Sequence, residues 1–258
     1  MKQLSTLLPR SLTSQHSISS ISGVPRIIKV VSLDAMNTIV KLKEPPHFVY
    51  SRFARIYGLD VNPNAMSFAF SEQMKLLSIT HPCFGFNSIG SFEWWKRVII
   101  GSLEKASSSS ISVSCGDALS RDLYRYYEEV DAWGYVDINI KEALTSLKMK
   151  GIVLVVLSNF DTRLKTILSH MKLSSLFDLV ILSGEVGIEK PDPNIFNIIV
   201  RRFGLDNKSD LLHIGDDVIK DFEGAQSYGA QAILFDPLNK HCRIASTNRI
   251  SSFSQLII

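Results

Sequence analysis

Three short apolar runs, each followed directly by polar side chains, constrain the fold of this chain more than any other feature. The first leads into Asp34, the second into Ser158 and Asn159, and the third into Asp216. Apolar runs of this length are typical of strands that are buried on both faces of a parallel sheet. Ligands of such sheets bind beyond the carboxyl ends of the strands. We therefore expect these polar side chains to meet at one edge of a sheet.

From Asn139 to the C-terminus, strand-like and helix-like segments alternate. Asn139 and Glu142 match a capping box at the start of a helix that ends at Gly151. Strands are expected at 152–157, 177–182, 211–214 and 231–235, and helices at 162–172, 193–203 and 220–228. Strands that alternate with helices form parallel sheets with right-handed crossovers. The sequence therefore predicts an α/β fold.

Residues 43–137 interrupt this alternation. Apolar side chains recur there at helical spacing, as in the stripe around Trp94 and Trp95, and Pro63 is placed to begin a helix. Four helices are expected in this stretch, and no strand. The predicted organisation is a core formed by residues 27–42 and 138–258, with a helical insert at 43–137.

Charge and cysteine content narrow the function. The net charge is +3, and no basic cluster with interleaved aromatic residues occurs, so we expect no nucleic-acid partner. No apolar run approaches the roughly 20 residues that span a bilayer, so we expect no membrane partner. Three widely spaced cysteines indicate neither a disulfide framework nor a zinc site, which favours an intracellular location; they are Cys83, Cys115 and Cys242.

The first 26 residues have a different composition. They are rich in Ser and Thr, contain Lys2, Arg10 and Arg26, and lack acidic residues. This composition is typical of a mitochondrial presequence and equally of a disordered tail. The expected location is therefore cytoplasmic or mitochondrial.

The polar side chains at the strand ends match the needs of phosphoryl transfer. That reaction requires a nucleophile, a neutralising charge and groups that position the phosphate. Asp34 could be the nucleophile, and Lys190, which precedes a Pro-Asp-Pro helix start, could offset negative charge. Ser158 and Asn159, ahead of a helix, could bind phosphate oxygens. Asp216 could supply a carboxylate oxygen to Mg²⁺.

Each of these residues also has an ordinary structural explanation. Asp34 could cap a loop, and Ser158 could cap the helix that follows it. Asp216 and Asp217 could cap the helix that begins near residue 219, and Lys190 could be a solvated surface lysine. The position of all four motifs in one order along the chain favours a common site.

These motifs resemble the four signature motifs of the haloacid dehalogenase (HAD) superfamily, and the resemblance covers roughly residues 27–258. The segments are VVSLDAMNT (30–38), VLVVLSNFD (153–161), GIEKPDPNIF (187–196) and LLHIGDDVIKD (211–221). The segment SNFDTRL, the Trp94-Trp95 pair and the last two motifs further resemble the group of HAD-like hydrolase domain-containing protein 3 and rhythmically expressed gene 2 proteins.

The resemblance implies a fold and a set of roles. The fold would be a parallel, Rossmann-like core with an inserted helical cap domain that closes over the site. The reaction would be Mg²⁺-dependent hydrolysis of a small phosphorylated metabolite through an aspartyl phosphate. Asp34 and Lys190 would be catalytic, and Ser158 and Asn159 would bind phosphate. The metal would be held by Asp34, Asp216 and the backbone carbonyl of Met36, supported by Thr38, Asp217 and Asp221.

The first motif departs from the usual Asp-x-Asp-Gly-Thr of HAD phosphatases. Met36 stands where that family places its general acid/base, a function worth about 10²–10⁴-fold in rate. Asn37 replaces the glycine and can adopt a left-handed backbone conformation.

Three functions therefore stay open. One is a phosphatase of low or specialised activity, and another is a non-catalytic HAD-fold binding protein. The third is a 2-haloacid dehalogenase, whose first motif lacks the second Asp and which needs no metal. The sequence predicts neither the substrate nor the oligomeric state.

Overall fold

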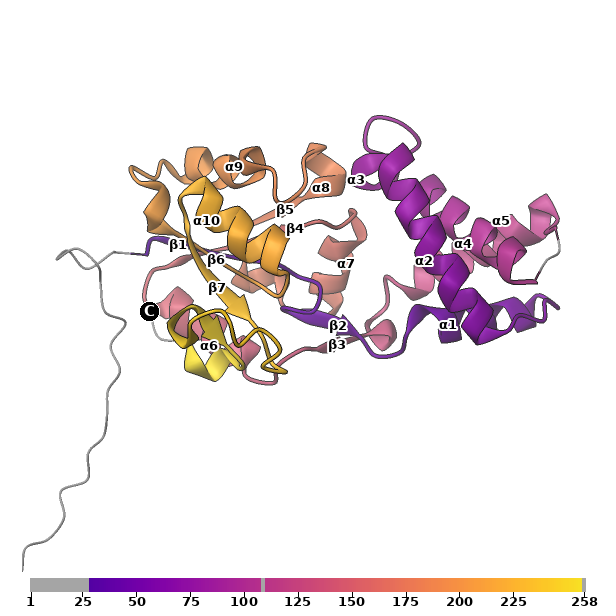
Figure 1. Cartoon of the computed structure of the whole chain (residues 1–258), viewed down its shortest axis with the longest axis horizontal. Helices are drawn as coiled ribbons and strands as arrows, with labels where there is room; N and C mark the ends of the chain where they lie inside the picture. The colour runs from indigo at the N-terminus through magenta and orange to yellow at the C-terminus, as the bar shows by residue number, and fades with distance from the viewer. Residues whose placement is uncertain (1–27, 108–109, 257–258) are drawn as a thin grey trace, which may run out of the picture.

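The computed structural model describes residues 28–107 and 110–256, so the presequence or tail predicted for residues 1–26 lies outside the described residues. The larger of the two parts of the molecule is built on a six-stranded sheet with the order β5-β4-β1-β6-β7-β8, in which every neighbouring pair is parallel (Figure 1). The strands are β1 (Val30–Leu33), β4 (Val153–Ser158), β5 (Leu179–Leu182), β6 (Leu211–Gly215), β7 (Gln231–Phe235) and β8 (Arg249–Ile250). The parallel α/β fold is confirmed.

The register of the sheet aligns the strand ends that carry the candidate site. Leu33, the last residue of β1, pairs with Val156 of β4 and Ile214 of β6. The N–H of Asp34 then donates to the carbonyl of Ile214 at 2.9 Å. The residues that follow these three strands are thereby brought to one edge of the sheet.

Helices cover both faces of the sheet. Alternate residues of β4 belong to different cores, with Leu154 and Val156 in one and Val155 and Leu157 in the other. The covering helices are α6 (Ile140–Met149), α7 (Arg163–His170), α8 (Ser183–Val186), α9 (Pro193–Phe203), a π-helix (Val218–Glu223) and α10 (Gly224–Tyr228). Because both faces of the sheet are buried, the strand sequences are continuously apolar instead of alternating between apolar and polar residues.

Two local predictions were wrong. The Asn139 side chain makes no capping bond to α6, because its amide donates to Asp137 and Ser252 instead. The helix expected at 220–228 begins earlier, at Val218, and its first part is a π-helix.

The insert folds into a helical bundle beside the core (Figure 1). It contains α1 (Pro46–Ile56), α2 (Pro63–Thr80), the single turn α3 (Pro82–Gly85), α4 (Ser91–Ser107) and α5 (Val113–Tyr126). The four expected helices are present. The described helices include none that is both long and apolar enough to cross a bilayer.

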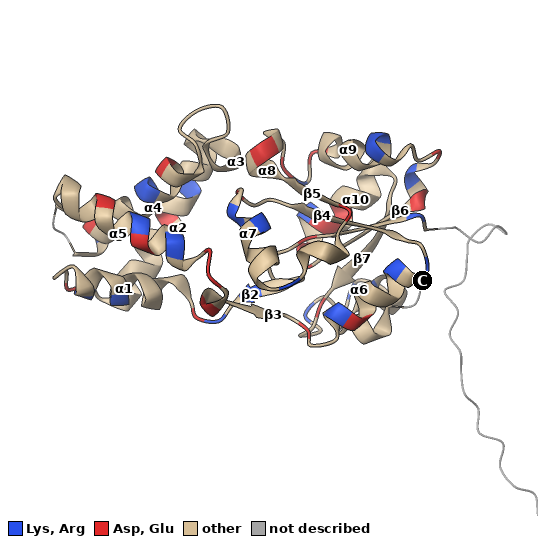
Figure 2. Cartoon of the chain, turned by 180° about the vertical axis from the view of Figure 1, so that it is seen from behind, with Lys and Arg blue, Asp and Glu red and all other residues tan. Residues whose placement is uncertain are grey.

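A two-stranded antiparallel ribbon joins the bundle to the core, and the sequence did not predict it. β2 (Val40–Leu42) pairs with β3 (Trp133–Tyr135), and both strands lie between the two parts in the opposite views of Figures 1 and 2. The expectation of no strand within 43–137 was therefore wrong, since three-residue strands are too short to show a period of two.

Candidate functional site

Asp34 is buried at the carboxyl end of β1, with one carboxylate oxygen fixed. Its Oδ1 accepts hydrogen bonds from Ser158 Oγ at 3.0 Å and from Lys190 Nζ at 2.7 Å. Its Oδ2 makes no hydrogen bond to any described residue. The structure thus orients the carboxylate and leaves one oxygen available for chemistry.

Lys190 is an interior cation shared by two carboxylates. Its side chain is 1% exposed, and its Nζ also donates to Asp221 Oδ1 at 2.6 Å. Burial alone would lower the pKa of Lys190, but the charges of Asp34 and Asp221 outweigh burial and raise it. Lys190 therefore stays charged, and the alternative of a solvated surface lysine is excluded.

Asn159 holds the backbone of Lys190. Its Oδ1 accepts the N–H of Lys190 at 2.8 Å, and its Nδ2 donates to the carbonyl of Lys190 at 2.9 Å. Both polar atoms of this side chain are therefore used to place the lysine. Phosphate binding by Asn159 stays a prediction, and its backbone is the part left to perform it.

Asp216 completes an acidic cluster beside Asp34. Asp34, Asp216 and Asp221 each offer a carboxylate oxygen, and these atoms lie within 4.8 Å of one another. Thr38 Oγ1 donates to Asp216 Oδ1 at 3.3 Å. Burial, followed by the charges of Asp34 and Asp221, raises the pKa of Asp216 to about 6. Carboxylates that repel one another in this way suit a hard cation with oxygen ligands, such as Mg²⁺.

Asp221 belongs to the cluster but is already satisfied by the protein. Its Oδ1 accepts from Lys190 and lies 3.1 Å from His213 Nε2, and its Oδ2 accepts the N–H of Asp217. Burial would raise its pKa, but Lys190 and His213 hold it well below the usual range. A Cβ at Gly215 would lie 2.2 Å from Asp221 Cγ, so only glycine allows this close approach.

His213 is a buried part of the site that sequence analysis missed. It lies within β6, and its Nδ1 is 2.8 Å from Ser32 Oγ of the neighbouring strand. Burial lowers its pKa, so the ring is neutral and can donate from Nε2 to Asp221. A histidine inside an apolar strand carries no motif, and it reaches Asp221 only because the π-helix after β6 folds back on that strand.

Asp217 caps a helix, which is the structural alternative that the sequence analysis gave for this residue. Its Oδ1 accepts the N–H groups of Ile219 and Lys220, each at 2.9 Å, and so caps the π-helix. Asp216 is not the cap. The adjacent acidic residues are thus divided between a helix cap and the acidic cluster.

The loop after Asp34 turns back sharply to form β2. Asn37 has a φ of 59°, in the left-handed region, and its N–H donates to the carbonyl of Val40 at 2.7 Å. The predicted conformation of Asn37 is confirmed. Met36, at the start of this turn, lines a cavity rather than joining the polar network.

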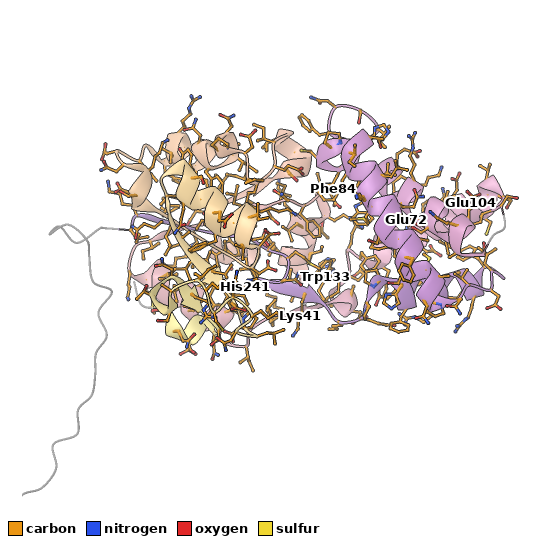
Figure 3. All side chains as sticks on the ribbon, in the orientation of Figure 1. Lys41, Glu72, Phe84, Glu104, Trp133 and His241 are labelled. Carbon is orange, nitrogen blue, oxygen red and sulfur yellow. The ribbon has the colours of Figure 1, made fainter. Side chains whose placement is uncertain are left out.

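That cavity, with a volume of about 270 Å³, lies where the bundle faces the core. Figure 3 labels two of its residues, Phe84 of α3 and Trp133 of β3, on the bundle side of the sheet. Its lining consists mainly of aromatic and apolar side chains: Met36, Leu42, Pro46, Tyr50, Phe70, Met74, Phe84, Trp95, Tyr127, Trp133, Asn159, Phe160 and Arg163.

A buried ion pair ties the wall of this cavity to the core. Arg163 donates from Nε and Nη2 to the carboxylate of Asp161 at 2.9 and 2.6 Å. Trp95 of α4 donates from its indole nitrogen to the same carboxylate at 2.6 Å. Arg163 also lies over the ring of Trp95, with its Cζ 4.8 Å from the ring centre. These contacts fasten the bundle to the loop after β4.

Comparison with known proteins agrees with this arrangement. A family model described as haloacid dehalogenase-like hydrolase matches residues 28–229. The human haloacid dehalogenase-like hydrolase domain-containing protein 3 is 28% identical over 208 residues, which cover 80% of this chain and 81% of that protein. The rhythmically expressed gene 2 protein of Drosophila melanogaster is 28% identical over 215 residues, which cover 80% and 82%.

The fold also matches solved structures. The magnesium-bound form of the putative HAD-hydrolase YfnB from Bacillus subtilis, for which interdomain movement is described, superposes with a TM-score of 0.68. The match covers 89% of this chain and 96% of that one, at 18% identity. This likeness supports a Rossmann-like core with flanking helices.

Proposed function

The chain belongs to the haloacid dehalogenase-like hydrolase family, and on this basis we propose that it hydrolyses small phosphate monoesters through a phosphoryl group carried by Asp34. The observation that carries the proposal is the state of the Asp34 carboxylate. One oxygen is held by Ser158 and Lys190, and the other makes no hydrogen bond to a described residue. The carboxylate lies beside that of Asp216. An oriented but accessible oxygen is what a carboxylate nucleophile requires.

In the proposed reaction, Asp34 Oδ2 attacks the phosphorus, and the bond from phosphorus to the ester oxygen breaks. The leaving oxygen departs with the electron pair of that bond. Water then attacks the phosphorus of the aspartyl phosphate, which releases phosphate and restores the carboxylate. Lys190 offsets the charge that accumulates near Asp34, and the Ser158 hydroxyl can turn from Asp34 to a phosphoryl oxygen.

The acidic cluster fits a magnesium ion. Asp34 and Asp216 would hold it, together with the backbone carbonyl of Met36 that the family pattern implies, because Asp221 is engaged by Lys190 and His213. When bound, the ion supplies positive charge to the phosphoryl oxygens. Thr38 orients Asp216 for this role.

The helical bundle is proposed to act as a cap over this site. It is joined to the core by the β2–β3 ribbon, and the cavity with Met36 in its wall lies between the two parts. A cap in this position excludes water and contacts the part of the substrate beyond the phosphoryl group.

A second candidate is a HAD-fold protein that binds phosphate ligands without turnover. Met36 favours it, because a thioether cannot deliver a proton to the leaving group. The third candidate is a 2-haloacid dehalogenase, whose first motif also lacks an Asp at the position of Met36. The acidic cluster argues against it, since that reaction needs no metal.

A screen for phosphate release from small monoesters, with and without Mg²⁺, tests the proposal. Wild type should turn over at least one ester only with Mg²⁺, and Asp34→Asn should be inactive. The matched control is Asp60→Asn, the same change at an exposed position in the bundle, which should keep full activity. Equal release by Asp34→Asn would contradict the proposal, and metal-independent halide release from a 2-haloacid would favour the dehalogenase.

A further inference from the structure

The cavity between bundle and core opens beside the reacting carboxylate. Met36, two residues after Asp34, and Asn159, next to Ser158, both line it. The part of a substrate that lies beyond the transferred phosphoryl group must therefore enter this cavity. The side chains that line the cavity therefore indicate the chemical class of the leaving group. This inference rests on the proposed function.

The size and walls of the cavity suit one planar ring. Its volume is about 270 Å³, whereas a cavity of roughly 150 Å³ holds benzene. Trp95, Trp133, Phe84 and Phe160 contribute flat apolar surfaces from four different segments. Aromatic rings of a ligand pack on such surfaces in offset or edge-to-face contacts. One substituted ring fits, and a long polar chain would leave the walls uncovered.

One donor in the cavity wall lacks an acceptor. Arg163 uses Nε and Nη2 on Asp161, while its Nη1 bonds to no described residue. The hydroxyl of Tyr127 also has no partner among the described residues, but it is buried beyond the reach of a ligand atom. Polar groups of buried side chains are usually hydrogen-bonded. Because arginine can only donate, the missing partner of Arg163 is an acceptor oxygen on the ligand.

The charge of that acceptor follows from Asp161. This carboxylate is fully buried and already neutralises Arg163, so the cavity carries no net positive charge to bind an anion. A neutral oxygen, such as a carbonyl or ether, can accept the free hydrogen bond of Arg163 without adding an unpaired charge.

Met36 defines how the ester oxygen leaves. A thioether lines the cavity at the family's acid/base position, and Asp161 is occupied by Arg163 and Trp95. A leaving oxygen therefore departs as an anion. Phenolic oxygens do so readily, with a pKa of about 10, whereas alkoxides need a proton.

We propose that the substrate is an aryl phosphate monoester whose single ring bears a neutral oxygen acceptor. The phosphoryl group lies at Asp34, the ring fills the aromatic cavity, and its acceptor meets Arg163. The phosphorus–oxygen bond breaks with its electrons on the phenolic oxygen, which takes a proton from water after release.

Calorimetry with leaving-group phenols tests the cavity without catalysis. We compare 3-acetylphenol with 3-isopropylphenol, whose substituent has a similar size but no acceptor oxygen, using the full chain with Mg²⁺. The acetyl compound should bind about fivefold more tightly, as expected for one net hydrogen bond. The preference should vanish in Arg163→Lys, which keeps the positive charge beside Asp161 but has no Nη1. It should persist in Tyr127→Phe, which removes a hydroxyl that no ligand atom reaches. Equal binding of the two phenols to wild type would overturn the inference.

Kinetics separate this inference from the proposed function. Acetyl phosphate has an activated leaving group and no ring, so its hydrolysis needs Asp34 but not the cavity. The KM for 3-acetylphenyl phosphate should be about tenfold lower, because the ring buries apolar surface. If acetyl phosphate turnover depends on Asp34 but the aryl ester has no lower KM, the cavity inference fails and the proposed function stands. If the phenols bind but neither ester is hydrolysed, the proposed function fails, and the phenol is a ligand rather than a leaving group.

Discussion

Lys190 connects the residues of the site because its single ammonium group serves two buried carboxylates. Asp34 is one partner and Asp221 the other, at 2.7 and 2.6 Å. Each carboxylate is further supported by a neutral group, Ser158 for Asp34 and His213 for Asp221. Removing one member of such a buried pair leaves an uncompensated charge, which costs about 3–5 kcal/mol. Asp34 is therefore held in place only when Lys190, Asp221 and their neutral partners are all present.

The absence of an acid/base at position 36 can be tested by restoring it. Met36→Asp should raise hydrolysis of alkyl phosphates by about 10²-fold, because their leaving oxygen needs a proton in the transition state. Activated aryl phosphates should gain little. Steady-state rates on both ester classes measure this, with Met36→Asn as the matched variant that cannot transfer a proton. A folded, Mg²⁺-binding Met36→Asp protein without any gain would favour the binding-protein function.

The two adjacent acidic residues should differ in metal binding. Asp216→Ala should weaken Mg²⁺ binding by more than about tenfold, because it removes a proposed ligand. Asp217→Ala should change the affinity little, since that carboxylate caps the π-helix. Isothermal calorimetry on the two variants makes the comparison. Equal losses would place the metal elsewhere.

The pKa of Asp216 predicts how metal binding depends on pH. Its pKa is raised to about 6, so the metal-free protein holds this proton up to that pH. Above pH 6 the deprotonated carboxylates of the cluster repel one another, which lowers the stability of the metal-free fold. Bound Mg²⁺ offsets this repulsion. Below pH 6 proton and metal compete, and the affinity should fall by about tenfold per pH unit. Calorimetry from pH 5 to 8 should show this fall, and a flat profile would contradict it.

Among the elements, a single carboxylate anchors the C-terminal segment to the start of α6. Asp137 accepts from the N–H of Asn139 and the hydroxyl of Ser252 at 2.9 and 2.8 Å, and from the N–H of Phe253. Phe253 is fully buried against Phe235 of β7, with ring centres 5.0 Å apart. The anchor thereby keeps the end of the chain on the core.

Replacing this anchor should destabilise the fold in a pH-dependent way. Burial would raise the pKa of Asp137, but its hydrogen bonds outweigh burial and lower it. The stabilisation is therefore present above the ordinary carboxyl pKa and is lost as pH falls through the lowered value. Asp137→Asn should cost about 2 kcal/mol at pH 7 and less at pH 3. Urea unfolding of both proteins at both pH values tests this, and an unchanged difference would contradict it.

For the molecule as a whole, the sequence predicted those features of the site that depend only on where the buried strands end. Asp34, Ser158 and Asp216 follow buried strands, so a parallel sheet must bring them to one edge. His213 was missed because it lies within an apolar strand, and only the turn from β6 into the π-helix places Asp221 beside it. The β2–β3 ribbon was missed because its strands are three residues long. The cavity could not be predicted, since its walls come from segments as distant as Met36 and Arg163.

Whether Asp34 carries a phosphoryl group is the most direct test of the proposed mechanism. We would incubate the protein with acetyl phosphate and Mg²⁺, quench in acid, and measure intact and peptide masses. Wild type should gain the mass of one phosphoryl group on the peptide that contains Asp34, and Asp34→Asn should gain none. A wild-type protein that binds Mg²⁺ and hydrolyses acetyl phosphate without any adduct on Asp34, or with the adduct on another residue, would contradict the mechanism.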